Sequence, residues 1–248
     1  MQRVDISEKE RIDVESWRTN PYESPESDSI HNIINKMTDV PCLLECQAPF
    51  DSIFKKSTAV FELGGGQGWA SCVLKRIYPQ ADFTVSDISE FAVASVHKWE
   101  KILSVTTEKP LACKSYDIPV PDASFDCVFT FSAAHHFGAH RKSLAEIHRV
   151  LKPGGSAFYF HEPACRPWIY KRAYLRVNRG RPDVPEDVIV YSKLIKIAEA
   201  VGFKAEFRFT PTLHKRGPKE YLYYTVLRAF PFLQHIFPCT GTFHFSKK

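Results

Sequence analysis

Short apolar segments alternate with longer amphipathic ones between residues 59 and 160. The short segments are apolar at nearly every position, whereas the longer ones have the period of a helix. The predicted strands cover residues 59–63, 82–86, 111–115, 125–131 and 156–160. Strands that are apolar on both faces and separated by helices are typical of a parallel sheet covered by helices on both sides. Ligands of such sheets bind beyond the carboxyl ends of the strands.

The segments between and after these strands predict helices with recognisable ends. Ser89 is a suitable N-cap, because its hydroxyl can accept a hydrogen bond from the first helical turn. Gly202 is a suitable helix stop. The predicted helices cover residues 69–78, 89–99, 140–151, 187–201 and 219–237, the last interrupted near Pro231, and two further strands cover 203–209 and 240–245.

Two segments depart from this alternation. Residues 1–50 are amphipathic in places, which predicts an N-terminal helical cap or lid ahead of a main domain at 51–248. Residues 163–188 form an insertion after the fifth strand, with six Lys/Arg and no acid between Pro163 and Pro182. We expect residues 1–50 to close over the cofactor, and the insertion to shape the substrate side of the protein together with residues 221–237.

A cluster of glycines follows the first predicted strand and precedes a helix. Four of the eleven glycines of the chain lie between Glu62 and Trp69. Glycine permits the tight turns and the close backbone approach that a nucleotide-like ligand needs. Neither the dinucleotide fingerprint G-x-G-x-x-G nor the phosphate loop G-x-x-x-x-G-K-[ST] fits this spacing. The pattern E-x-G-x-G-x-G does fit, from Glu62 to Gly68.

These motifs resemble those of class I S-adenosylmethionine (SAM) dependent methyltransferases, most closely the small-molecule group with a methyltransferase type 11 domain. The resemblance covers about residues 58–162 and includes Tyr116-Asp-Ile-Pro119, the 121–126 turn and the turn at 149–155. It implies a Rossmann-like fold with a mostly parallel seven-stranded sheet. It also implies SAM as cofactor and S-adenosylhomocysteine as product. Gln67 and Trp69 are less usual for the family.

The resemblance also implies residues that hold SAM. Asp87, at the end of the second strand, corresponds to the acid that binds the ribose hydroxyls, and Ile88 to the residue that packs on adenine. Asp117 corresponds to the carboxylate beside the adenine amino group. The full implied set is Glu62, Gly64, Gly65, Gly66, Gly68, Asp87, Ile88, Asp117, Ile118 and Ser132.

Three histidines are candidate catalytic groups. An oxygen or nitrogen acceptor with a high pKa needs a general base, and the ordinary pKa of histidine suits that task. His135 and His136 follow the fourth strand, and we expect His136 to be the base with His135 as second choice. His161, beside Glu162 at the end of the fifth strand, is the rival. The fourth strand ends without Asp or Asn, so we expect no metal.

The substrate is expected to meet aromatic side chains from both flanking segments. The candidate substrate-binding residues are Trp17 and Tyr22 in the lid and Trp168 and Tyr170 in the insertion. Residues 221–237 are too short, and too interrupted by Arg228 and Pro231, to cross a bilayer. We expect this segment to roof an apolar substrate pocket. A membrane surface contact and a homodimer face stay open as alternatives.

Composition and charge narrow the function classes. The chain has 248 residues, 44% of them hydrophobic, which is enough to bury a core without disulfides. The seven scattered cysteines lack a C-x-x-C pair, and no apolar leader precedes the charged start, so a cytoplasmic protein with reduced thiols is expected.

The charge distribution leaves three functions to compare. Residues 162–248 carry sixteen Lys/Arg and seven Asp/Glu, whereas the whole chain has a net charge of +5. That is less than a dedicated nucleic-acid binder carries, so a nucleic-acid partner is not expected. Methyl transfer to a small metabolite, such as a natural-product, sugar or lipid-linked intermediate, is the first expectation. The alternatives are an RNA or protein methyltransferase and a catalytically silent SAM-binding protein.

Overall fold

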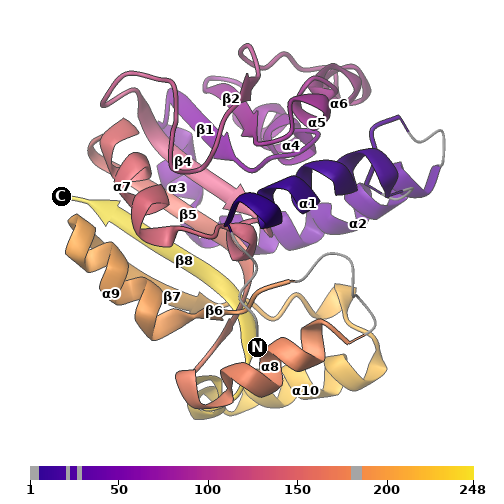
Figure 1. Cartoon of the computed structure of the whole chain (residues 1–248), viewed down its shortest axis with the longest axis vertical. Helices are drawn as coiled ribbons and strands as arrows, with labels where there is room; N and C mark the ends of the chain where they lie inside the picture. Colours follow the sequence, from indigo (N-terminus) through magenta and orange to yellow (C-terminus); the bar gives the residue numbers. More distant parts are fainter. Residues whose placement is uncertain (1–5, 21–22, 27–29, 180–185) are drawn as a thin grey trace.

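A twisted sheet runs through the middle of the molecule, with helices packed on both of its faces (Figure 1). The computed structural model describes residues 6–20, 23–26, 30–179 and 186–248. The strand order is β3-β2-β1-β4-β5-β8-β7, and β6 pairs with the end of β5. Among the strands of these described residues, β8 alone runs antiparallel to its neighbours, β5 and β7. The expected mostly parallel, seven-stranded, Rossmann-like sheet is confirmed, with β6 as a short addition.

The strands and helices have the following bounds. The strands are β1 Ala59–Leu63, β2 Asp82–Asp87, β3 Leu111–Ala112, β4 Phe125–Phe131, β5 Leu151–Cys165, β6 Ile189–Val190, β7 Phe203–Phe209 and β8 Cys239–Lys247. The α-helices are α1 Ile6–Thr19, α2 Ile30–Gln47, α3 Asp51–Lys56, α4 Trp69–Ile77, α5 Glu90–Val93, α6 Val96–Leu103, α7 His140–Val150, α8 Tyr170–Val177, α9 Tyr191–Val201 and α10 Pro218–Ala229. The 3₁₀ helices are η1 Ala48–Phe50, η2 Ala134–His136, η3 Pro167–Ile169, η4 Leu213–Lys215 and η5 Pro231–His235.

The boundaries differ from the predicted ones where a strand gains or lacks a neighbour. The third strand is only two residues long, because it lies at the edge and pairs with β2 alone. The fifth is fifteen residues long, because it pairs with β4, β6 and β8. The helix predicted from residue 187 begins at Tyr191, since Ile189 and Val190 pair with Ala164 and Cys165.

Helix ends follow the local signals more closely. The hydroxyl of Ser89 accepts a hydrogen bond from the backbone N–H of Ala92 and caps α5, as predicted. The helix then breaks, and α6 continues from Val96. Gly202 ends α9 with a φ of 113°. The segment expected as one broken helix at 219–237 forms α10 and the 3₁₀ helix η5 on either side of Phe230.

Each face of the sheet carries its own hydrophobic core. On β5, Phe158 and Phe160 point to the side of α2, α3 and α4, while Tyr159 points to the side of α7 and α9. Phe158 and Phe160 stack on each other with ring centroids 5.1 Å apart. Burying one such ring contributes about 2–3 kcal/mol. The alternation along β5 therefore fixes which face of the sheet each helix layer covers.

The N-terminal helices have two different environments. Helix α2 buries Cys42, Leu43 and Cys46 in the core, so it is a fixed part of the fold. Helix α1 lies on the outside of the sheet, beside the labelled α2 (Figure 1). Of the expected lid over residues 1–50, α1 is the part that lies outside the core, and that it acts as a lid stays a prediction.

No helix in the described part of the chain is long and apolar enough to span a membrane.

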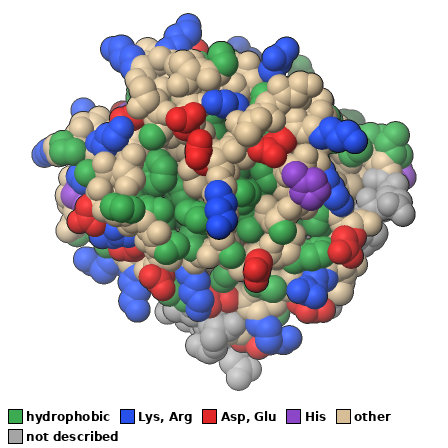
Figure 2. Space-filling view, turned by 90° about the horizontal axis from the view of Figure 1, so that it is seen from above, with side chains coloured by type: hydrophobic (Ala, Val, Ile, Leu, Met, Phe, Trp, Pro, Cys, Tyr) green, Lys and Arg blue, Asp and Glu red, His purple; other side chains and the backbone are tan. Residues whose placement is uncertain are grey.

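The upper side of the molecule, seen from above, carries acidic and basic side chains around a central hydrophobic area (Figure 2).

Candidate active site

The glycine turn lies between β1 and α4 and has a strained path that glycine alone tolerates well. Gly64 has a φ of 71° and Gly66 a φ of 53°. A Cβ on Gly66 would lie 2.3 Å from the ring of Trp17, and one on Gly64 would lie 3.1 Å from the Cβ of Ala133. The N–H of Gly65 donates to the carbonyl of Ser86, which ties the turn to β2. Both the backbone conformation and the space therefore require glycine here.

Asp87 joins the end of β2 to this turn. One of its carboxylate oxygens accepts a hydrogen bond from the N–H of Gly66 and the other from the N–H of Ser89, both at 2.8 Å. The side chain is buried, and burial raises the pKa of Asp87 to about 6. The two motifs expected to hold the cofactor thus meet at the carboxyl edge of β1 and β2.

Glu62 supports the turn from inside. Its carboxyl group is buried and accepts a hydrogen bond from the N–H of Ser71 in α4 at 3.1 Å. Burial raises the pKa of Glu62 to about 8, because removal from water disfavours the charged carboxylate. A Cβ on Gly65 would lie 2.7 Å from the Glu62 carboxyl carbon. Gly68 is likewise confined, since its Cβ would lie 2.8 Å from Val96.

The other expected cofactor residues lie in less uniform surroundings. Ile88 is half-buried directly after Asp87, and Asp117 is exposed in the turn that follows β3. Ser132 is exposed at the end of β4, with a φ of 51°. Ile118, in contrast, packs in the hydrophobic core on the side of α7.

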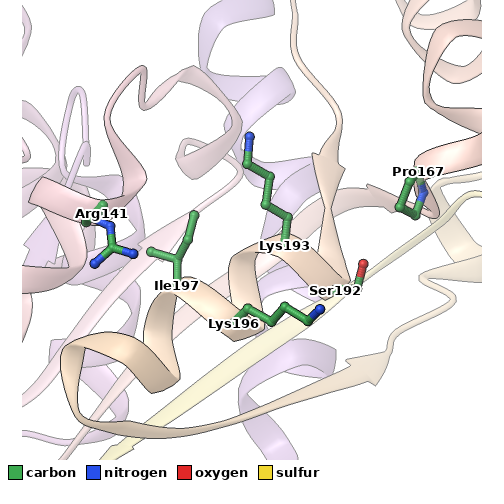
Figure 3. A pocket seen from close by; sticks show the side chains of 6 residues that line it. All are labelled: Arg141, Pro167, Ser192, Lys193, Lys196 and Ile197. Atoms are coloured by element: carbon green, nitrogen blue, oxygen red, sulfur yellow. The ribbon is translucent and has the colours of Figure 1, made fainter.

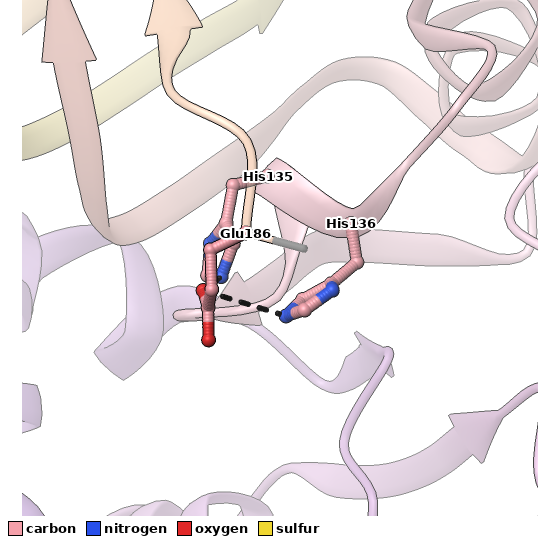
Figure 4. Close-up of side chains that lie close together, drawn as sticks. All are labelled: His135, His136 and Glu186. Atoms are coloured by element: carbon pink, nitrogen blue, oxygen red, sulfur yellow. Dashed lines mark ion pairs between the residues drawn. The ribbon is translucent and has the colours of Figure 1, made fainter. Parts of the chain in front are cut away.

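His135 lies between two carboxylates. Its Nδ1 is 2.8 Å from Glu162. Its Nε2, on the other side of the ring, is 2.7 Å from Glu186, which Figure 4 shows beside both histidines. Glu162 is fully buried and also accepts hydrogen bonds from the N–H groups of Ala133, Ala134 and His135. Burial alone would lower the pKa of His135, because it disfavours the charged imidazolium. The two carboxylates have the larger effect and raise this pKa to about 9. His135 is therefore an imidazolium at neutral pH.

His136 has looser contacts than its neighbour. Its ring centroid is 4.2 Å from that of His135, its Nδ1 is 3.4 Å from Asp13 in α1, and its Nε2 is 3.9 Å from Glu186. The side chain is 26% exposed, compared with 5% for His135. Of the two adjacent histidines, His136 is the more exposed, although its Nδ1 atom is buried.

His161 does not join this pair. Its Nε2 is 3.3 Å from the hydroxyl of Thr212, and its ring stacks on Phe131 with centroids 5.5 Å apart. Burial, together with the nearby cations Arg216 and Lys215, lowers the pKa of His161 to about 3. It is a neutral packed side chain on the side of α2 and η4.

A methyltransferase-domain model matches residues 61–159, which contain the glycine turn, Asp87 and both adjacent histidines. Residues 61–159 are a methyltransferase domain. This match agrees with the strand order and with the resemblance of the motifs to class I SAM-dependent methyltransferases. The methyltransferase domain expected from the sequence is thereby confirmed for residues 61–159.

Two curated relatives act on small molecules by name. The chain is 31% identical over 108 residues to phthiotriol/phenolphthiotriol dimycocerosates methyltransferase of Mycobacterium tuberculosis, covering 44% of this chain and 38% of that protein. It is 34% identical over 150 residues to dimethylglycine N-methyltransferase of Parasynechococcus marenigrum, covering 59% of this chain and 51% of that protein. The match to these relatives thus spans between about a third and a half of their length.

A solved structure matches nearly the whole chain. Haemonchus contortus phospholethanolamine N-methyltransferase 2, in complex with phosphomonomethylethanolamine and S-adenosylhomocysteine, has a TM-score of 0.65 at 14% identity. The match covers 99% of this chain and 60% of that one. At this identity the likeness shows the fold.

The residues of the methyltransferase site fit SAM. The glycine turn leaves a surface without Cβ atoms, and the Asp87 carboxylate lies at the same sheet edge, where a ribose would need an acceptor pair. Trp17 of α1 lies over Gly66 and also faces the ammonium group of Lys36 at 5.7 Å. Helix α1 therefore covers the edge at which the cofactor would bind.

The expected substrate residues separate into two groups. Trp17 lies at the glycine turn, and the Tyr170 hydroxyl donates to Asp187 at 2.8 Å, next in sequence to Glu186. Trp168 is instead exposed beside Arg166 on the outside of the molecule. Tyr22 lies outside the described residues.

One ligand atom each of His135, His136 and Glu186 lie within 4.8 Å of one another. A divalent ion would need its ligand atoms about 3 Å apart, from bonds of about 2.1 Å at tetrahedral or octahedral angles. The 2.7 Å contact between His135 and Glu186 instead suits a shared proton. That the site works without a metal stays a prediction.

Three residues that contact His135 or His136 carry no motif signal in the sequence. Asp13 and Lys9 come from α1, and Lys9 donates to the carbonyl of His135 at 3.1 Å. Glu186 comes from the segment before β6. All three reach the site through long-range packing. Glu186 is brought to the histidines by the pairing of β6 with β5. A strand of two residues, such as β6, is too short to predict from the sequence.

Proposed function

We propose that this protein transfers the methyl group of SAM to an oxygen or nitrogen atom of a small-molecule metabolite. The observation that carries the proposal is the arrangement at one sheet edge. The Asp87 carboxylate is hydrogen-bonded to the glycine turn after β1, and the partly exposed His136 follows the neighbouring strand β4. The names of the relatives support a small acceptor, since they include a lipid methyltransferase and an N-methyltransferase of a glycine derivative.

The cofactor would be held by the turn and by the carboxylate. Asp87 accepts hydrogen bonds from the ribose hydroxyls, and the glycine turn lies against the methionine end. SAM supplies an already activated methyl group, so the protein mainly aligns the acceptor and removes its proton. Ile88 and Asp117 are proposed contacts of the adenine.

His136 is proposed as the group that takes the acceptor's proton. His135 is unsuited to this step, because its two carboxylate partners keep it protonated. When His136 accepts the proton, Asp13 and Glu186 stabilise the imidazolium. Glu162 holds the η2 turn and His135 in place, so it acts as a positioning residue.

Helix α1 is proposed as the lid of this site. Trp17 lies on the glycine turn, while Lys9 and Asp13 reach the two histidines. Hydrogen exchange within residues 6–19 should change when S-adenosylhomocysteine is added, because Trp17 must adjust to the ligand. Unchanged exchange in α1, together with measurable ligand binding, would leave α1 as a fixed cap.

The function is tested by cofactor binding and by product formation. Calorimetry with S-adenosylhomocysteine should show a single site, and the Asp87→Asn variant should bind it more weakly. Release of S-adenosylhomocysteine from SAM is then measured with a panel of fatty acids, quinols and amino-acid derivatives. Absence of binding would overturn the assignment. Turnover with tRNA or protein and with no small molecule would overturn the substrate class.

A further inference from the structure

The outer lobe of the molecule consists of η3 and α8 with α10 and η5, that is residues 166–179 and 218–237. Helices α8 and α10 lie side by side at one end of the molecule (Figure 1). They are joined by the pair Arg176 and Glu220 at 3.9 Å and by Arg176 over the ring of Tyr223. Arg166 donates to the carbonyl of His235 and so joins η3 to η5. These contacts make the four segments one continuous surface.

Large apolar side chains of the outer lobe are exposed. Trp168 is 68% exposed, Leu222 66% and Phe232 61%. Leu222 and Val226 lie four residues apart on α10, and Phe230 follows directly after its last residue. The other exposed members are Leu175, Tyr221, Ile236 and Phe237. An exposed apolar area of this extent marks an interaction surface in most proteins.

The charge of the same lobe is almost entirely positive. Its residues include seven Lys/Arg and a single acid, Glu220, which is paired with Arg176 and Arg216. On the side of η3 and α8, exposed apolar and basic residues alternate on one face, in the order Trp168, Arg172, Leu175 and Arg179.

A cationic hollow of about 360 Å³ borders this lobe. It is lined by Arg141 of α7, by Pro167 of η3, and by Ser192, Lys193, Lys196 and Ile197 of α9 (Figure 3). Pro167 is the residue next to Trp168, so the hollow and the apolar surface share the η3 segment. Its three cations could receive an anionic headgroup beside the aromatic side chains.

We propose that the outer lobe docks on the surface of an anionic lipid bilayer, with Trp168 and the α10 to η5 apolar side chains in the interface and the surrounding Lys/Arg against acidic headgroups. Basic helices with exposed aromatic and leucine side chains bind such surfaces through burial of the apolar side chains and through attraction of the cations to anionic headgroups. A second copy of this chain fits less well, because a twofold contact through this face would bring the same cations together. The proposal is independent of the methyl-transfer reaction.

The test is flotation of the full chain with lipid vesicles. Vesicles of phosphatidylcholine alone are compared with vesicles of equal parts phosphatidylcholine and phosphatidylglycerol. The protein should bind the anionic vesicles, and added salt should weaken the binding. Inorganic phosphate at matched ionic strength should not displace it. Binding that phosphate abolishes would assign the hollow to a free anion and overturn the docking proposal.

Two sets of substitutions separate the apolar and the charge contributions. The triple change Leu222→Ser, Phe230→Ser and Phe232→Ser should lower the partition coefficient at least about tenfold. Lys171→Gln and Arg172→Gln should lower it by about fivefold for each charge, and only on anionic vesicles. The matched control is Ile30→Ser with Ile34→Ser on α2, where exposed apolar side chains lie outside the lobe.

Each control has a decisive outcome. Affinity for S-adenosylhomocysteine should be unchanged in all lobe variants, which shows that they fold. Equal loss of vesicle binding in the α2 control would overturn the assignment to this lobe. Light scattering that shows a dimer in the wild type and a monomer in the triple variant would assign the surface to a second copy instead.

Discussion

The side chains of the cofactor edge, that is the glycine turn at 64–68 with Glu62 and Asp87, and those of the outer lobe differ in whether they have partners within the protein. At the cofactor edge nearly every named group has an internal partner: Asp87 is bonded to Gly66 and Ser89, and Glu62 to Ser71. In the outer lobe, Leu222 and Phe232 are mostly exposed. Substitutions at the cofactor edge should therefore change the stability of the fold or the binding of the cofactor. Substitutions in the lobe should instead change the binding of the protein to an external surface.

The largest effect is expected from Gly64→Val. Valine would have to adopt a φ of 71° with its Cβ 3.1 Å from Ala133, so the turn must shift. Binding of S-adenosylhomocysteine, measured by calorimetry, should be lost. The matched control is Gly154→Ala, which has a φ of 76° but nothing within 4 Å of its Cβ. If Gly64→Val binds normally, the turn does not hold the cofactor.

The next effect is a loss of rate in His136→Ala. Removal of a general base should lower kcat/KM by about 10²–10⁴-fold, while the affinity for S-adenosylhomocysteine stays unchanged. His161→Ala should retain its rate, because that ring packs against Phe131 and Thr212. Near-full turnover in His136→Ala would place the base elsewhere, or show that alignment alone suffices.

The ion pair between His135 and Glu162 should contribute to the free energy of unfolding. Replacement by leucine leaves Glu162 buried without its charged partner and should cost about 3–5 kcal/mol of unfolding free energy. Because the pKa of His135 is raised in the folded protein, its contribution is complete below the ordinary histidine pKa and is lost as the pH rises through about 9. Urea unfolding across this range measures both. A wild-type curve as flat as that of His135→Gln would contradict the pair.

Asp87 should make cofactor binding depend on pH. The raised pKa of about 6 means that its carboxylate forms only as the pH rises through that value. Affinity for S-adenosylhomocysteine should therefore increase between pH 5 and pH 7. Asp87→Asn should weaken binding by about 1–3 kcal/mol and remove this dependence. A variant with the same pH profile would assign it to another group. The free energy of unfolding should depend on pH in the opposite direction. Because the carboxyl pKa is raised in the folded protein, Asp87 stabilises the fold at low pH and less as the pH rises.

The smallest effect is expected in the outer lobe. Leu222→Ser removes a side chain that is 66% exposed, so the free energy of unfolding should change by less than about 0.5 kcal/mol. Chemical denaturation with Leu227→Ser as the matched comparison checks this, because Leu227 is buried on the same helix and should cost several times more. Equal losses would mean that Leu222 is covered within the protein.

Local signals and long-range packing contribute differently to what could be predicted. The strand β1, its glycine turn and the N-cap Ser89 follow from short sequence patterns, because neighbouring residues determine them. The partners of His135 do not, since Glu162 and Glu186 come from separate segments. The adjacency of His135 and His136 made both of them candidates, with His136 preferred on its position alone. Only the positions of those carboxylates distinguish a held imidazolium from an accessible base.

The extent of α1 links two events of a catalytic cycle. The helix has fourteen residues, about 21 Å, and it contacts His136 through Asp13 and the glycine turn through Trp17. If α1 is the lid proposed above, one rigid helix covers both places, and we predict that the spent cofactor and the methylated product become free together when it opens. Their release then shares a single opening rate, and a substitution such as Asp13→Asn that loosens one end should speed the departure of both.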